Sequence, residues 1–255
     1  MTSTADQTGM LDGMRAAGRL AAGAMAAAGR AVLPGASTAD LDGIVEGYIR
    51  GHGGMPATKG MRGFPNAACI SVNHVVCHGI PSAGKRLADG DIVKIAFKAA
   101  MDGWHAGIAR TFHAGSPTPR GRLLVERVFQ ALDAGIAVLR PGATTGDLGH
   151  AIQQVAEARR AGVAFQVVRE LGGHGIGRAF FMEPHVPHHG RPGEGDPIAE
   201  GTCLSVQPIL VAGKPDIKTL PDGWSIVTRD RSWSAQAEDT VVVTGEGAEI
   251  LTRPG

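Results

Sequence analysis

The chain has 255 residues, of which 43% are hydrophobic and 19% charged, a composition typical of a globular protein with a substantial core. Its 25 basic and 24 acidic residues leave a formal net charge of +1, too little to attract a nucleic acid or an anionic membrane. Disorder and fibrous structure are therefore excluded, and we expect a small molecule, a peptide-like substrate or another protein as the partner.

The N-terminal stretch MTSTADQTGM has no basic segment followed by an apolar run, and no later apolar stretch is long enough to span a bilayer. We therefore expect a cytoplasmic protein in which residues 1–9 form a flexible tail. Cys69, Cys77 and Cys203 are odd in number and lie at unrelated spacings, so we interpret them as reduced thiols packed like small apolar residues.

A repeated pattern follows the tail. Helical periodicity without proline covers residues 14–32 and again residues 122–139. The segments AVLPGASTADLDGIVEGYI, from Ala31, and AVLRPGATTGDLGHAIQQVA, from Ala137, each end that helix, turn at Pro-Gly and begin a second helix. A Ser or Thr ahead of Asp-Leu is the expected N-cap of both second helices.

The resemblance between the two halves continues downstream of these helices. CHGIP around His78 matches GHGIG around His174, and LADGDIVKIA matches IAEGTCLSVQ, which places Ala96 opposite Gln207. Residues 92–112 are predicted to form a β-hairpin that turns at Asp102 and Gly103. The sequence therefore predicts one α+β domain, residues 10–255, built from two pseudo-symmetric halves around a central antiparallel sheet and one shared site.

Seven segments carry a resemblance to a known family: GFPNAACISVNHVVCHGIP, LADGDIVKI, MDGWHAGIARTF, LRPGATTGDLGHAIQ, GGHGIGR, DGWSIVTRDRSWSAQAEDTVVVT and EILT. In this order and spacing, from about Met10 to Thr252, the chain resembles the bacterial type I methionine aminopeptidases of the pita-bread fold. The resemblance implies that fold for nearly the whole chain, and by the same resemblance we expect a monomer.

The family resemblance also implies a dinuclear metal centre held by two Asp, one His and two Glu. By position, the two Asp fall on Ala96 and Gly107 and the His on His174, while the two Glu fall on Gln207 and Glu238. A second active-site histidine of the family is kept as His78. The family's further assisting histidine falls on Phe181, which is followed here by Met182, Glu183 and Pro184.

Two divalent ions about 3.5–4 Å apart repel each other unless several carboxylates offset the repulsion. Glu238 is the one carboxylate left at the aligned positions, so we predict no metal and no other cofactor. Asp102 is expected to serve the hairpin turn. His185, His188 and His189 lie in a Gly- and Pro-rich stretch that we interpret as a solvated polar loop.

An apolar pocket is expected to survive beside these positions. The residues predicted to bind substrate there are Met61, Phe64, Cys69, Phe180, Phe181, Met182 and Trp224. The polar groups converging on it, which we predict to be catalytic, are His78, His174, Gln207 and Glu238.

Three functions compete for such a site. The main hypothesis is a repurposed, metal-independent enzyme that performs acid/base chemistry on a small, partly apolar substrate, such as isomerisation, elimination, cyclisation or condensation in a biosynthetic pathway. The first alternative is a non-catalytic protein that binds a peptide N-terminus or a metabolite. The second alternative is the metal-dependent removal of N-terminal methionine from peptides.

Overall fold

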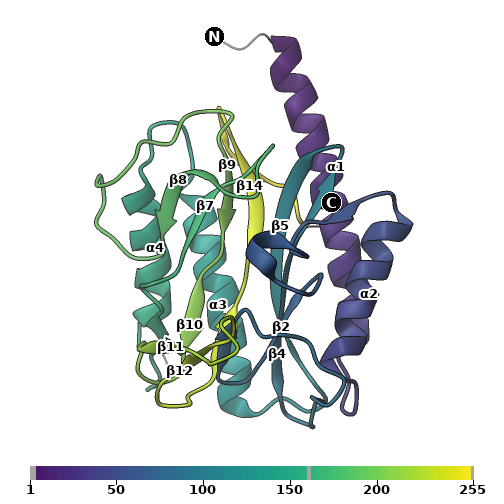
Figure 1. Ribbon diagram of the computed structural model, residues 1–255. Helices are drawn as coiled ribbons and strands as arrows, with labels where there is room; N and C mark the ends of the chain where they lie inside the picture. Colours follow the sequence, from purple (N-terminus) through teal and green to yellow (C-terminus); the bar gives the residue numbers. More distant parts are fainter. Residues whose placement is uncertain (1–3, 160–161, 254–255) are drawn as a thin grey trace.

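The computed structural model describes residues 4–159 and 162–253 and begins with two helices (Figure 1). Helix α1 spans Thr4–Arg30 and α2 spans Thr38–Gly51. Residues 4–9, which were expected in a tail, are therefore helical, because no proline separates them from the Ala-rich helix that follows. Residues 1–3 of the predicted tail, and residues 254–255 of the predicted domain, lie outside the described part.

The first half continues with a four-stranded antiparallel sheet. Strands β1 (Met55–Pro56), β4 (Ile92–Met101) and β2 (Cys69–Val72) follow one another in that order, and β5 (Trp104–His113) pairs with β4. The turn between β4 and β5 lies at Asp102 and Gly103, with φ angles of 50° and 77°. Both values are positive, as a two-residue hairpin of this type requires, so the predicted hairpin is confirmed.

The second half repeats this plan with α3 (Pro119–Ala137) and α4 (Thr145–Glu157). Its main sheet has five antiparallel strands in the order β15 (Gly247–Ile250), β14 (Asp239–Thr244), β9 (Cys203–Val206), β7 (Gly172–Gly175) and β8 (Met182–Pro187). Figure 1 shows α1 and α2 on one side of the molecule and α3 and α4 on the other, with the strands between them.

Two small sheets complete the fold. One contains β13 (Ser234–Gln236), β10 (Ile209–Val211) and β6 (Gln166–Val167), in that order. The other contains β11 (Ile217–Thr219), β12 (Ile226–Thr228) and β3 (Val75–Cys77). Because β3 comes from the first half and β12 from the second, this sheet connects the two. A short 3₁₀ helix, η1, spans Met61–Gly63.

The repeated motif builds the same N-terminus on α2 and α4. Ser37 caps α2 by accepting from the backbone of Asp40, whose carboxylate accepts in return from the Ser37 backbone. Thr144 and Asp147 form the same capping box on α4. Such a box satisfies two amides that the helix leaves without partners. The caps predicted from the sequence repeat are therefore confirmed in both halves.

Each half has its own apolar core between its helices and its main sheet. Leu41, Val45 and Ile95 belong to the core of the first half, and Leu132, Leu148 and Leu204 to that of the second. The two main sheets meet at an isolated antiparallel bridge between Ala109 and Glu238. In the described residues, no helix is long and apolar enough to cross a membrane.

Candidate functional site

A cavity of about 260 Å³ lies between the two halves, beside the bridge that joins their sheets. Most residues predicted for the site line it: Met61, Phe64, Cys69, His78, His174, Phe180, Phe181, Gln207, Trp224 and Glu238. The first half contributes η1, β2, β4 and the segment after β3, and the second contributes β7, the residue that follows β9 and the residue that precedes β14. The duplicated fold thus brings together side chains that are far apart in sequence.

Met182 was also expected in the pocket, and this prediction is wrong. Its side chain is 46% exposed and does not line the cavity. Its sulfur lies over Gly177, 3.2 Å from where a Cβ on that glycine would be, so Met182 packs against the neighbouring loop. Phe181 precedes β8 and lines the cavity, whereas Met182, the first residue of β8, does not.

One end of the cavity is apolar. The rings of Phe64 and Trp224 meet edge to face with centroids 5.1 Å apart, and His78 lies edge-on to the same indole at 6.4 Å. The free thiols of Cys69 and Cys77 line this end, and burial raises the pKa of both, that of Cys77 to about 12. These thiols stay protonated at neutral pH and behave as apolar wall.

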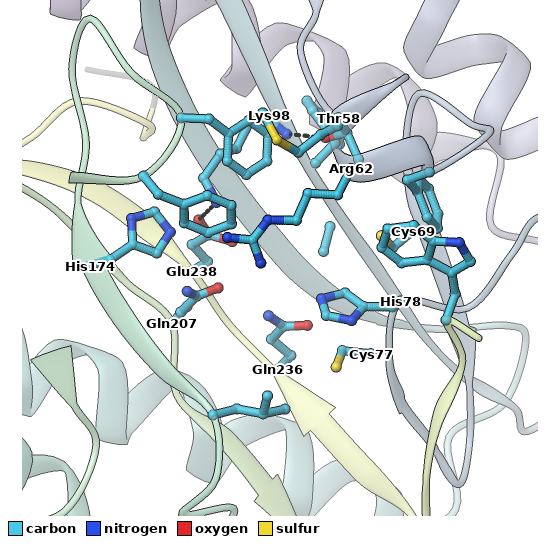
Figure 2. A pocket seen from close by; sticks show the side chains of 18 of the residues that line it. Thr58, Arg62, Cys69, Cys77, His78, Lys98, His174, Gln207, Gln236 and Glu238 are labelled. Carbon is cyan, nitrogen blue, oxygen red and sulfur yellow. Dashed lines mark hydrogen bonds and ion pairs between the residues drawn. The ribbon is translucent and has the colours of Figure 1, made fainter. Parts of the chain in front are cut away.

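Glu238 is the carboxylate of the polar end. Its Oε1 accepts a hydrogen bond from Ser205 Oγ at 2.6 Å and lies 4.0 Å from the ammonium of Lys98. Burial raises the pKa of Glu238, although the charge of Lys98 and the bond from Ser205 act in the opposite direction. The carboxylate therefore already has two partners within the protein. One of them, Lys98, is drawn beside Glu238 in Figure 2.

His174 extends from β7 with its two ring nitrogens in different situations. Its Nδ1 donates to the carbonyl of Gly175 at 2.7 Å, which leaves the buried Nε2 as an acceptor without a partner. Burial lowers the pKa of His174 to about 4, and the positive charge of Lys98 acts in the same direction. The imidazole is neutral at pH 7, with its lone pair available to a ligand.

Gln207 is held in place by a histidine that the sequence analysis interpreted wrongly. Its side-chain amide donates to the carbonyl of Gly172 at 2.7 Å, and its backbone amide donates to His188 Nε2 at 3.2 Å. His188 is only 1% exposed, and burial lowers its pKa to about 3. It is therefore a buried structural residue and not part of a solvated loop.

The first half provides no metal donor at the two positions aligned with aspartates. Ala96 lines the cavity with a methyl group. A Cβ on Gly107 would come within 2.2 Å of Glu238 Oε1 and 3.1 Å of Lys98 Cε. The space beside Gly107 is thus filled by the carboxylate of Glu238 and by the side chain of Lys98.

We tested these residues against the metal pair that the family resemblance implies. The unpartnered Nε2 of His174 is suitable for a metal, but Gln207 is neutral and the charge of Glu238 is shared with Lys98. Within residues 4–159 and 162–253, no group of three or more His, Cys, Asp or Glu could hold a metal ion. This donor set does not fit two divalent ions, and a fixed ammonium beside it adds repulsion.

Four polar lining residues were missed by the sequence analysis: Thr58, Arg62, Lys98 and Gln236. Strand alternation could have indicated two of them, since Lys98 lies two residues after Ala96 and Gln236 two residues before Glu238. Thr58 accepts from the backbone amide of Lys98 at 2.8 Å. Arg62, in η1, has a φ of 49°, and no sequence pattern predicted that it would reach the cavity.

Comparison with known proteins gives consistent results. The model of metallopeptidase family M24 matches residues 12–245. Methionine aminopeptidase of Escherichia coli (strain K12) is 42% identical over 243 residues, which cover 95% of this chain and 90% of that protein. Methionine aminopeptidase 1 of Mycobacterium tuberculosis is 42% identical over 246 residues, covering 96% and 92%.

Solved structures agree with the curated relatives. The crystal structure of methionine aminopeptidase from Rickettsia prowazekii superimposes with a TM-score of 0.93 at 39% identity, covering 99% of both chains. The prolidase from Pyrococcus furiosus, with a TM-score of 0.75 at 21% identity, shares the fold. The α+β pita-bread fold predicted from the sequence is therefore confirmed.

These findings correct the main functional hypothesis. A repurposed enzyme performing metal-independent acid/base chemistry on a small molecule is contradicted, because relatives about 40% identical over 95% of the chain are methionine aminopeptidases. They favour the second alternative, the metal-dependent removal of N-terminal methionine from peptides. By its matched length and its structural neighbours, the chain belongs to metallopeptidase family M24.

Proposed function

We propose that the cavity binds the N-terminal residue of a peptide, with a methionine side chain in its apolar end. The name of the relatives, methionine aminopeptidase, supports this substrate class. The observation that carries the proposal is the apolar wall of Phe64, Cys69 and Trp224 in a cavity between the two halves. An unbranched, polarizable methionine side chain suits such a surface of sulfur and aromatic rings.

The polar end is proposed to hold the backbone of that first residue. His174 offers an acceptor, Gln207 an amide, and His78 lies where the apolar and polar ends meet. Glu238 contacts Ser205 and Lys98, and its carboxylate offsets the charge of Lys98 at this end. We assign these four residues to substrate recognition, and because the donor set does not fit a metal pair we derive no cleavage step.

Binding can be tested with tripeptides that differ only in the first side chain. Calorimetric titration should show that Met-Ala-Ser binds more tightly than Lys-Ala-Ser or Asp-Ala-Ser, and the same order should hold when all three are N-acetylated. Replacing Trp224 with Ala should weaken the methionine peptides about tenfold, since a large apolar contact is lost. Trp224→Phe is the matched control and should retain most of the affinity. Equal binding of all three first residues would contradict the proposal.

Turnover is measured in the same samples by the release of free methionine, with added Mn²⁺ or Co²⁺ and with a chelator. Release that depends on the added metal would assign aminopeptidase activity, as in the relatives. Binding without release would assign the second candidate, a non-catalytic protein for peptide N-termini. The donor set of the site is the specific observation that favours this second candidate.

A further inference from the structure

The charges that line the cavity are predominantly positive. Among the described lining residues, Arg62 and Lys98 are cations and Glu238 is the single carboxylate. If Lys98 and Glu238 are both charged they cancel, and if a proton passes between them both become neutral, so in either case the charge of Arg62 remains. Protonation of a lining histidine would only add to it. In both of these states of the pair the cavity therefore carries a net positive charge.

Both cations are held in place by aromatic rings. The Lys98 ammonium lies 4.3 Å from the centroid of the Phe180 ring and 5.2 Å from that of Phe181, and the Arg62 guanidinium lies 5.1 Å from the Phe181 centroid. Contacts of this kind stabilise a cation at a fixed position. Figure 2 shows the guanidinium of Arg62 extending into the cavity toward the side where Glu238 and Gln207 lie.

Two buried acceptors in the same cavity have no partner. They are Nε2 of His174 and Oε1 of Gln236, on side chains that are 8% and 4% exposed. A buried acceptor without a hydrogen bond is costly, and such atoms in a cavity point to a ligand that supplies N–H groups. Arg62 and Lys98, which line the same cavity, supply N–H donors for a carbonyl oxygen. A cavity that offers both unpartnered acceptors and N–H donors can satisfy both groups of an amide.

A free peptide N-terminus fits this arrangement poorly. Its ammonium would enter a cavity with excess positive charge, where the one carboxylate is already bonded to Ser205 and lies next to Lys98. Moving an ion from water into such a site without a counter-charge is unfavourable. An acylated terminus is neutral, and it presents one N–H and one additional C=O group.

We propose that the ligand of this cavity is a peptide whose N-terminal amine is acylated, with a formyl or acetyl group. Its amide N–H faces His174 or Gln236, and its acyl oxygen accepts from Arg62 or Lys98. The inference rests on the proposed function, because it keeps a peptide N-terminus with an apolar first side chain as the ligand. It narrows that substrate class by the chemistry of the terminus.

The test compares N-formyl-Met-Ala-Ser, N-acetyl-Met-Ala-Ser and free Met-Ala-Ser by calorimetric titration at pH 7. We expect the two acylated peptides to bind at least about tenfold more tightly than the free one, given the excess of positive charge in a partly desolvated cavity. Free Met-Ala-Ser binding as tightly as the acylated peptides, or more tightly, would overturn the inference. If no peptide of either kind shows a preference for methionine, the proposed function itself fails, which is a different outcome.

Variants of Arg62 show whether charge causes the preference. The side chain is exposed at the edge of the cavity, so its replacement does not threaten the core. Arg62→Lys keeps the charge and should keep the preference for acylated peptides, whereas Arg62→Gln should reduce it. Arg62→Glu should improve binding of the free peptide relative to the acylated ones by about tenfold. Lys, Gln and Glu are unbranched at Cβ like Arg, so at the positive φ of residue 62 the three variants should bear similar backbone strain. An unchanged preference across the three variants would contradict the inference.

Discussion

The two halves of the molecule share a plan but contribute different chemistry to the cavity between them. The second half supplies His174, Gln207 and Glu238, which include every side chain with a metal-type donor atom at the aligned positions. At those positions the first half has Ala96 and Gly107, and the cations Arg62 and Lys98 come from the same half. One copy of a duplicated unit can thus change the charge of a shared site while the fold of both copies is retained.

The difference arises from one face of strand β4. Side chains alternate along a strand, so Lys94, Ala96 and Lys98 point to the same side, toward the second half. Lys94 donates to the carbonyls of Asn73 and Ser234 at 2.7 and 2.8 Å, and Lys98 lies beside Glu238. Two lysine side chains therefore flank the position at which the family resemblance places a carboxylate.

The largest expected effect is on metal affinity, when the missing donor side chains are introduced. A variant with Ala96→Asp, Gly107→Asp, Gln207→Glu and Lys98→Ala should bind Mn²⁺ at least about a thousandfold more tightly than the parent, a gain of about 4 kcal/mol. Lys98→Ala is included because Lys98 Cε lies 3.1 Å from the place of a Cβ on Gly107.

The control for this variant carries the same three donors with Lys98 retained. It should gain much less affinity, because the ammonium repels the metal and fills the space beside Gly107. Calorimetry with elemental analysis of the dialysed proteins measures both effects. Two Mn²⁺ ions bound tightly by the parent protein would contradict the contrast between the halves.

Removing the carboxylate of the second half should have the next largest effect, on stability. Glu238→Ala leaves the Lys98 ammonium, which is 6% exposed, without its counter-charge. We expect the free energy of unfolding to fall by about 3 kcal/mol. The double variant Glu238→Gln with Lys98→Met removes both charges and should recover most of this loss in urea denaturation. A double variant as unstable as Glu238→Ala would show that the ion pair is not the cause.

The pH dependence of stability should reveal the other lysine of β4. Burial lowers the pKa of Lys94 to about 7, from an ordinary value of 10.5 in the unfolded chain. Between these two pH values the unfolded state binds a proton that the folded state does not, so the free energy of unfolding rises with pH over this window, by about 3 kcal/mol. Urea denaturation from pH 7 to 8.5 should show the rise; at higher pH the thiols of Cys69, Cys77 and Cys203 ionise in the unfolded chain but stay protonated in the folded one, because burial raises their pKa, and this lowers the free energy of unfolding.

Lys94→Met is the matched variant for this measurement, because it keeps the length of the side chain without the titrating group. Its stability should change less over the same pH window. An equal slope in parent and variant would assign the rise to other groups.

Removing the helix caps should have the smallest effect on the free energy of unfolding, and the loss should be similar in the two halves. Ser37→Ala and Thr144→Ala each remove one capping box, and each should lower the free energy of unfolding by about 1 kcal/mol. Ser37→Thr and Thr144→Ser keep the hydroxyl and should be close to neutral. Losses that differ widely between the two alanine variants would show that the halves are less equivalent in energy than in structure.

The capping boxes also show what the sequence could predict. A repeat of Pro-Gly, Ser or Thr, and Asp-Leu is a local signal, and it determined two helices correctly because capping depends on neighbouring residues. The hairpin turn at Asp102 and Gly103 is local in the same sense. The burial of His188 could not be predicted, because it depends on the backbone amide of Gln207, which is distant in the chain.

The composition of the cavity was predictable only in part. Positions aligned with a known family correctly placed His78, His174, Gln207 and Glu238 around one cavity. The alignment gave no indication of lining residues that have no known role in the family. Lys98 was predictable, because the alternation of side chains along β4 places it on the same face as Ala96. Arg62 was not, since its approach depends on a left-handed backbone turn in η1 and on the ring of Phe181 from the other half.

The bridge between Ala109 and Glu238 has one more consequence. The amide of Glu238 donates to Ala109 at 2.9 Å, and the amide of Ala109 donates back at 3.3 Å, so the residue whose carboxylate faces the cavity also joins the two main sheets. A ligand that contacts this carboxylate therefore also contacts the residue whose backbone joins the two sheets. Hydrogen–deuterium exchange at the backbone amides of Ala109 and Glu238 should therefore slow when a ligand is bound. The exchange rate would then report whether the cavity is occupied.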